Sequence, residues 1–135
     1  MIRQFHLIKP SRVTQSDKAK ARFGLIRECD ALIRPLVLAR DKVCQRCGSD
    51  KNLQDCHVLP KGRVPRLRFE LLNHIVLCMS CHLFWWHKAP LAAAEWFEDK
   101  FPGRTKLLLE LAATAKNPDL KELVLCLRVE VANLK

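Results

Sequence analysis

The chain has 135 residues, of which 49% are hydrophobic, so it fits one compact domain with its own core and global disorder is excluded. The formal net charge of +10 is carried by residues 1–68, which hold 16 Lys and Arg against 6 Asp and Glu, whereas residues 69–135 hold 8 of each. This asymmetry favours a polyanionic partner, nucleic acid before an anionic membrane surface, over a merely solvated basic surface.

The N-terminal residues 1–15 contain the strand-forming run FHLI, which Pro10 ends, and they predict an extended arm. They lack the long apolar core of a signal peptide. No run in the chain approaches the roughly 20 apolar residues that cross a bilayer. We therefore expect a cytoplasmic protein with no membrane partner.

A helix is predicted over residues 16–40, with Ser16 or Asp17 as its cap and apolar residues at helical spacing. Pro35 is expected to kink or split this helix. Basic residues would line much of its other face, and these are Lys18, Lys20, Arg22, Arg27, Arg34 and Arg40.

The middle of the chain combines two Cys-x-x-Cys pairs with short elements. Residues 41–55 predict a metal-binding knuckle with a turn at CGSD. The segment LQDCHVLP predicts a short strand that ends at Pro60, and KGRVPRLRF a basic loop. The segment NHIVLCMSCHLFWWHK is expected to run from a second knuckle into a helix that begins near Cys81.

Three helices are predicted in the C-terminal third, over LAAAEWFEDKF, RTKLLLELAATAK and DLKELVLCLRVEVANL, with Asn117 and Pro118 as the cap and first turn of the last one. This neutral, apolar third indicates a scaffold, and its helices could also pair two copies of the chain. We expect a single domain over 1–135, made of a basic arm and helix (1–43), a metal-binding core (44–90) and a helical scaffold (91–135).

Four of the seven cysteines form the two pairs, Cys44 with Cys47 and Cys78 with Cys81. Four thiolates make the tetrahedral set that a structural zinc requires. In a reducing compartment such pairs predict a metal site rather than disulfides, the alternative being four buried free thiols. The 30 residues between the pairs exceed the usual gap of about 15–20, so further structure is expected between the knuckles.

The order His57, Asn73, His82, threaded through two cysteine pairs, resembles the HNH nucleases. The stretch DKVCQRCGSDKNLQDCHVLPKGRVPRLRFELLNHIVLCMSCH is similar to a zinc-bound HNH (ββα-metal) endonuclease motif, in particular to small phage nucleases of the NinG-like recombination type. The resemblance covers residues 40–90, and neither flank adds to it. It implies an α+β fold with a ββα-metal (HNH) core and a zinc knuckle, flanked by N-terminal and C-terminal helices, in a protein of phage or prophage origin.

The resemblance also implies roles for the three residues. His57 would be the general base that takes a proton from water, His82 the ligand of a catalytic divalent ion, and Asn73 an orienting residue that hydrogen-bonds the loop backbone. Zinc bound at Cys81 would fix the helix start and so aim His82. The alternatives are a histidine that serves the fold at 57, a spare zinc ligand at 82 and an ordinary cap or loop residue at 73.

One departure from the family pattern concerns the residue before the base, where many HNH enzymes place a second metal ligand, Asp or His. Here that residue is Cys56, a poor ligand for Mg²⁺ and a better one for softer metals. Either Cys56 binds a transition metal, or Asp55 substitutes for it, or the ion has one protein ligand and several waters. A plain buried thiol is the favoured interpretation of Cys56. The expected cofactors are thus a structural Zn²⁺ and a catalytic Mg²⁺, Mn²⁺ or softer transition metal.

Candidate contacts to nucleic acid come from the basic loop and the following helix. Arg66 and Arg68 are expected to contact phosphates, with Arg63 and Lys61 as weaker candidates. His87 lies five residues after His82, not the four that would align the two on one helix face, but it could touch phosphate or metal from the rim. A further histidine, His74, is expected to be structural, and the tryptophans of the second knuckle to pack on the C-terminal helices.

These features favour a metal-dependent endonuclease that nicks or cuts duplex or branched DNA. A non-catalytic zinc-ribbon nucleic-acid-binding protein is the main alternative, but binding alone would require none of His57, Asn73 and His82. A helical interaction protein stapled by zinc fits the concentrated charge less well. Symmetric cleavage of two strands would need a homodimer, for which the C-terminal helices are candidates.

Overall fold

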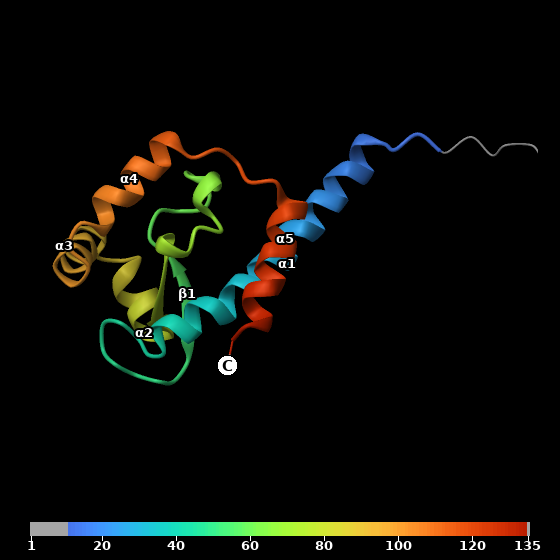
Figure 1. The fold of residues 1–135 in the computed structure, drawn as a ribbon. Coiled ribbons are helices and arrows are strands. Elements are labelled where there is room, and N and C mark those ends of the chain that lie inside the picture. Colours follow the sequence, from blue (N-terminus) through green and yellow to red (C-terminus); the bar gives the residue numbers. More distant parts are fainter. Residues whose placement is uncertain (1–10, 135) are drawn as a thin grey trace, which may run out of the picture.

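The computed structural model describes residues 11–134, and most of the arm predicted at 1–15 lies outside this range. The described residues form a mixed α+β fold with five α-helices and one two-stranded antiparallel sheet (Figure 1). The α-helices and strands are α1 (Gln15–Asp41), β1 (Leu53–His57), β2 (His74–Cys78), α2 (Met79–Cys81), α3 (Pro90–Lys100), α4 (Arg104–Thr114) and α5 (Leu120–Ala132). Shorter helical turns are η1 (Pro65–Leu67), η2 (Leu71–Asn73) and η3 (His82–Trp86). No helix of the described part is long and apolar enough to cross a membrane.

Helix α1 begins one residue earlier than predicted and has a different cap. The Thr14 hydroxyl accepts a hydrogen bond from the Asp17 backbone N–H at 3.1 Å, and the Asp17 carboxylate accepts one from the Thr14 N–H at 3.0 Å. This reciprocal pair is a capping box, which satisfies two donors at the helix start and so wins over a cap at Ser16 or Asp17. Of the two outcomes expected at Pro35, a kink or a split, the split does not occur, since α1 continues through Pro35 as one helix, with Ile33 and Val37 on either side of the proline buried in the core.

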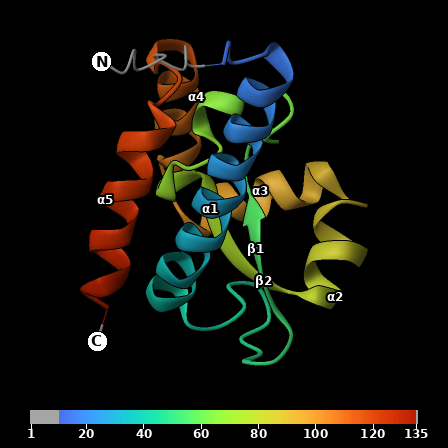
Figure 2. The ribbon, with the colours of Figure 1, turned by 90° about the vertical axis from the view of Figure 1, so that its right-hand side faces the viewer.

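The last helix, α5, packs along α1, as both views of the ribbon show (Figures 1 and 2). Leu120, Val124 and Leu127 of α5 form one buried cluster with Cys29 and Leu36 of α1. The predicted cap at Asn117 is wrong, since the side chain of Asp119 accepts the Glu122 N–H at 3.1 Å. One apolar face of α5 is therefore used inside the chain, while Leu125 and Val129 remain exposed.

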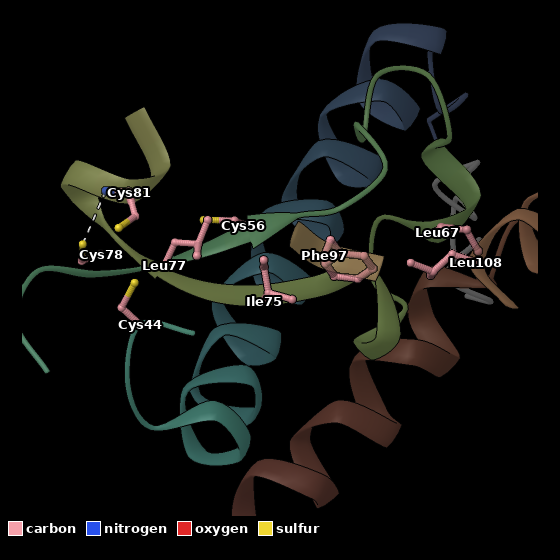
Figure 3. Close-up of a cluster of buried hydrophobic side chains, with 9 residues drawn as sticks. All are labelled: Cys44, Cys56, Leu67, Ile75, Leu77, Cys78, Cys81, Phe97 and Leu108. Atoms are coloured by element: carbon pink, nitrogen blue, oxygen red, sulfur yellow. Dashed lines mark hydrogen bonds between the residues drawn. The ribbon is translucent and has the colours of Figure 1, made fainter. Parts of the chain in front are cut away.

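The hairpin β1–β2 lies between two layers of helix. On one face Val76 packs with Ile33 and Val37 of α1. On the other face Ile75 and Leu77 join a cluster with Phe97 of α3 and Leu108 of α4 (Figure 3). All five residues of β2 are buried, as expected for a strand covered on both faces. The hairpin is thus the rigid centre on which the neighbouring loops and side chains are placed.

Two arginines anchor the start of β2 to both helical layers. Arg40 of α1 donates to the carbonyl oxygens of Leu71 and His74 at 2.7 and 2.5 Å. Arg104 of α4 donates to those of Leu72 and His74 at 2.8 and 2.6 Å. Arg40, which the sequence places on a basic helix face, is therefore engaged inside the fold.

Candidate functional site

The four paired cysteines converge on one point. The sulfur atoms of Cys44, Cys47, Cys78 and Cys81 all lie within 4.8 Å of one another, and Cys47 and Cys78 are 3.7 Å apart. A zinc ion bonded to four thiolates at about 2.3 Å requires sulfur–sulfur distances of about 3.8 Å. The cluster therefore fits a tetrahedral metal ion such as zinc, as the sequence predicts.

Backbone geometry brings the first pair into place. Gly48 has φ +77°, a left-handed conformation that glycine adopts without strain, and its N–H donates to the Cys44 carbonyl at 2.9 Å. The N–H of Gln45 donates to the Val76 carbonyl at 2.9 Å, which ties this turn to β2. Burial opposes ionisation of the Cys44 thiol, but backbone N–H donors, that of Cys47 first, lower its pKa to about 6. A thiolate, the form that binds metal, is thereby favoured at Cys44.

The second pair follows β2 directly, so the sheet positions it (Figure 3). Cys78 is the N-cap of α2, and its sulfur accepts the Cys81 N–H at 3.5 Å. Arg46, which the sequence analysis did not single out, reaches across from the first pair and donates to the Cys81 sulfur at 3.6 Å. Its guanidinium carbon lies 3.9 Å from the ring centroid of Trp85, so the first knuckle is held against the helix that follows the second.

An open cleft of about 810 Å³ lies between the hairpin, α1, η3 and α3, and one of its lining residues, His82, directly follows the cluster residue Cys81 in the chain. Four histidines line it, namely His57, His74, His82 and His87. Asp30 and Arg34 of α1 and Lys61 of the basic loop add charged groups. The cleft thus brings together three of the histidines to which the sequence analysis assigns a functional role.

His57, at the end of β1, is half-buried and hydrogen-bonded. Its Nε2 lies 3.0 Å from the backbone carbonyl oxygen of Arg68. Because a carbonyl can only accept, Nε2 carries the proton and the Nδ1 of the neutral ring keeps a free lone pair. Burial, and then the neighbouring His74, hold the pKa of His57 below its ordinary value. The ring is therefore neutral at neutral pH and able to accept a proton at Nδ1.

His74 is fully buried behind His57 and is placed by the strand register, which pairs the two residues. Its Nδ1 lies 2.7 Å from Oδ1 of Asp55, and its Nε2 lies 2.7 Å from the Arg68 carbonyl oxygen. Both contacts serve the fold, in line with the structural role expected for His74. Asp55, an alternative metal ligand in the sequence analysis, has one carboxylate oxygen engaged by His74.

His82 and His87 meet at the mouth of the cleft. The Nδ1 of His82 lies 2.5 Å from Oε1 of Gln54 on β1, and its Nε2 lies 2.8 Å from Nε2 of His87. The two residues share one face because η3 is a π-helix, in which the N–H of His87 donates to the His82 carbonyl at 3.3 Å. The expectation that a spacing of five separates them assumed an α-helix and is wrong for this segment.

Cys56 points into the core beside Ile75 and Leu77, and 1% of its surface is exposed. Its thiol donates to the Gln54 carbonyl at 3.6 Å. Burial raises the pKa of Cys56 to about 12, so the neutral thiol is the stable form. This environment matches the buried thiol that the sequence favours over a metal ligand.

Asn73 is completely buried between β2 and the loop after β1. Its Oδ1 accepts the Leu59 N–H at 2.7 Å, and its Nδ2 donates to the carbonyls of Leu59 and Leu67 at 3.0 and 3.1 Å. Asn73 therefore bonds the loop backbone, and the loop in turn presents the Arg68 carbonyl that holds His57. These bonds replace strand pairing, which explains why β1 ends at His57 rather than at Pro60.

The candidate phosphate-contacting residues differ in whether their side chains already bond other groups of the fold. The guanidinium of Arg68 makes two hydrogen bonds to Asp30, at 2.6 and 3.1 Å, and that of Arg66 bonds the Ala112 carbonyl. Lys61 and Arg63 are exposed, and Lys61 lines the cleft. The loop residues that the sequence ranked lower are thus the ones that extend into solvent.

The tryptophans of the second knuckle pack against α3. Trp86 meets Trp96 and Phe97 edge to face at centroid distances of 6.5 and 6.2 Å, and Trp85 meets Trp96 at 5.3 Å. This is the packing on the C-terminal helices that the sequence predicts, and it fixes the wall of the cleft.

Compared with known proteins, the chain matches no family model, no curated protein and no solved structure.

Proposed function

We propose that the protein is a metal-dependent endonuclease of the HNH (ββα-metal) type that hydrolyses phosphodiester bonds of duplex or branched DNA. The observation that carries this proposal is the cleft lined by both His57, with a free Nδ1, and His82, which directly follows Cys81 of the four-cysteine cluster. A hairpin that carries His57 and is followed at once by a helical segment with His82 is the arrangement that the motif resemblance implies.

In this mechanism the residues of the chain bind, orient and move a proton. Nδ1 of His57 accepts a proton from the attacking water, while the Arg68 carbonyl keeps the ring in the required tautomer. Lys61 offers a positive charge to the scissile phosphate at the edge of the cleft. A divalent ion held at His82 would supply charge neutralisation at the phosphate and at the leaving oxygen.

The charge distribution supports a nucleic-acid substrate. Helix α1 extends beyond the rest of the fold toward its N-terminus (Figure 1), and Lys18, Lys20 and Arg22 are exposed there. A basic helix of this kind can neutralise phosphates outside the cleft, which would raise affinity and make it depend on salt.

The test is nicking of supercoiled plasmid by the zinc-loaded protein with Mg²⁺, Mn²⁺, Co²⁺, Ni²⁺ or EDTA, with a four-way junction as second substrate. We expect cleavage that requires a divalent ion and is lost in His57→Ala. A protein that binds both DNAs but cleaves neither with any ion would instead be the non-catalytic zinc-binding nucleic-acid protein, which the basic α1 also fits.

A further inference from the structure

The two imidazoles of His82 and His87 point their Nε2 atoms at one another. The atoms are 2.8 Å apart, the ring centroids 4.5 Å, and the ring planes are inclined by 46°. Both residues line the cleft, and His87 is exposed at its rim. Two nitrogen donors therefore converge on one point that solvent can reach.

The tautomer of His82 places its lone pair on Nε2, the atom that faces His87. Its Nδ1 donates to the Gln54 side-chain oxygen at 2.5 Å, so the lone pair of the neutral ring lies on Nε2. Histidines that bind metals usually donate their other ring N–H to an oxygen acceptor in this way, which fixes the ring and raises the basicity of the donor nitrogen. Gln54, on β1, supplies that acceptor here.

The backbone is adapted to this pairing. In an α-helix a residue five positions along lies about 140° around the axis, so His82 and His87 would face apart. The π-helical turn η3 removes that offset and closes with the hydrogen bond from the His87 N–H to the His82 carbonyl. Turns of this type are uncommon and are frequent at functional sites.

We propose that His82 and His87 bind one divalent transition-metal ion through their two Nε2 atoms. Two nitrogens bonded to one ion at about 2.1 Å, with a nitrogen–metal–nitrogen angle of about 90°, are about 3.0 Å apart. The two Nε2 atoms, which are 2.8 Å apart, therefore need to separate only slightly to bind the ion. Imidazole donors suit Zn²⁺, Co²⁺, Ni²⁺ or Cu²⁺, whereas Mg²⁺ takes oxygen ligands. His87 is then the second protein ligand, in the role for which the sequence analysis considered Cys56 or Asp55.

That this ion is the one used in cleavage rests on the proposed nuclease function, but its binding does not. The test is calorimetric titration of the zinc-loaded protein with Co²⁺, and separately with Mg²⁺. We expect one Co²⁺ per chain beyond the zinc, bound more tightly than Mg²⁺. Gln54→Ala removes a residue that hydrogen-bonds a metal ligand, and such changes typically weaken metal binding by about 10–100-fold. His87→Ala removes a ligand itself, so it should weaken Co²⁺ binding by at least about tenfold.

The matched control is Lys88→Ala, which changes the exposed neighbour of His87 and should leave Co²⁺ affinity unchanged. His57→Ala should also bind Co²⁺ normally, because His57 is assigned to proton transfer. Unchanged Co²⁺ affinity in His87→Ala, or tighter binding of Mg²⁺ than of Co²⁺, would overturn the site. Normal Co²⁺ binding in a wild-type protein that cleaves no DNA would uphold the site and overturn only the nuclease function.

Discussion

His57 and His74 are cross-strand partners whose rings lie 4.4 Å apart, and both direct Nε2 toward the same carbonyl oxygen, that of Arg68. Both ring nitrogens of His74 are engaged, by Asp55 and by the carbonyl, whereas His57 uses only Nε2 in this contact and keeps the lone pair of Nδ1. The buried histidine thus supports the ring that the proposed mechanism uses as its base.

Replacing His74 tests this support. His74→Ala leaves the Asp55 carboxylate without its buried partner and removes one of the two imidazoles that contact the Arg68 carbonyl, so the free energy of unfolding should fall by about 1–3 kcal/mol. Urea denaturation at constant zinc concentration measures it. His87→Ala, at an exposed position, is the control and should change stability by less than about 0.5 kcal/mol without added metal. Equal stability of the two variants would contradict the supporting role.

In the proposed mechanism, the pH dependence of cleavage is set by the pKa of His57. Burial holds this pKa below the ordinary value of 6.5, so the neutral form that accepts a proton persists as the pH falls past 6.5. We expect the acid limb of the nicking rate to have its midpoint below pH 6.5. An acid limb centred above pH 6.5 would show that another group controls the rate.

The lowered pKa of His57 also makes the free energy of unfolding decrease as the pH falls. The unfolded chain binds a proton to His57 more readily than the folded chain, so stability falls as the pH drops from 6.5 toward the lower folded pKa. His57→Gln removes this contribution and should flatten the stability profile in that window.

If the four cysteines bind zinc as we expect, removal of that zinc should unfold the core. Binding of a structural zinc is worth on the order of 10–16 kcal/mol in small domains, and here the four cysteines join the turn before β1 to the segment after β2. We expect strong chelation to abolish the cooperative thermal transition, and Cys78→Ser to purify without its metal. Cys126→Ser changes an exposed cysteine outside the cluster and should retain one zinc per chain. A cooperative transition that survives in metal-free protein would contradict the assignment.

Asn73 should control the loop that carries Lys61 and Arg63. Asn73→Ala removes three hydrogen bonds of a fully buried side chain and leaves backbone groups of Leu59 and Leu67 without these partners, so we expect the free energy of unfolding to fall by at least about 2 kcal/mol. Limited trypsin digestion should then cut after Lys61 and Arg63 faster than in the wild type. Asn117→Ala, at an exposed residue, gives the reference rate.

Arg46 links the two knuckles, so its loss should loosen zinc. Arg46→Ala removes the hydrogen bond to the Cys81 sulfur and the stacking on Trp85. We expect zinc transfer to a coloured chelator to be about 10–100-fold faster, in line with the loss of partners of metal ligands. Lys51→Ala, an exposed change beside the same turn, should not alter the rate.

Local sequence signals predicted much of the fold. The predicted segments LAAAEWFEDKF and RTKLLLELAATAK form α3 and α4 close to their expected bounds, and the two cysteine pairs meet because their ligand chemistry admits one geometry. The cap of α1 was missed because Thr14, Ser16 and Asp17 are all good capping residues, and the reciprocal bond to Asp17 decides among them. Propensity alone does not reveal such a choice.

The candidate site was predictable in its residues but less so in its contacts. The strand register that stacks His74 on His57 and the bond from Arg68 to Asp30 depend on tertiary packing. The π-helical turn that joins His82 to His87 has no sequence signature. The sequence shows only that the two histidines are five residues apart and that two tryptophans lie between them. Arg46 carried no signal beyond its place between the first two cysteines.

The most direct test of the central claim is the rate of plasmid nicking by zinc-loaded wild type and His57→Ala at a saturating divalent ion. If His57 is the general base, the variant should retain zinc and fold but lose about 10²–10⁴-fold in rate, the usual contribution of such a base. A folded His57→Ala protein that nicks as fast as the wild type, or a wild type that nicks equally in EDTA, would contradict the account.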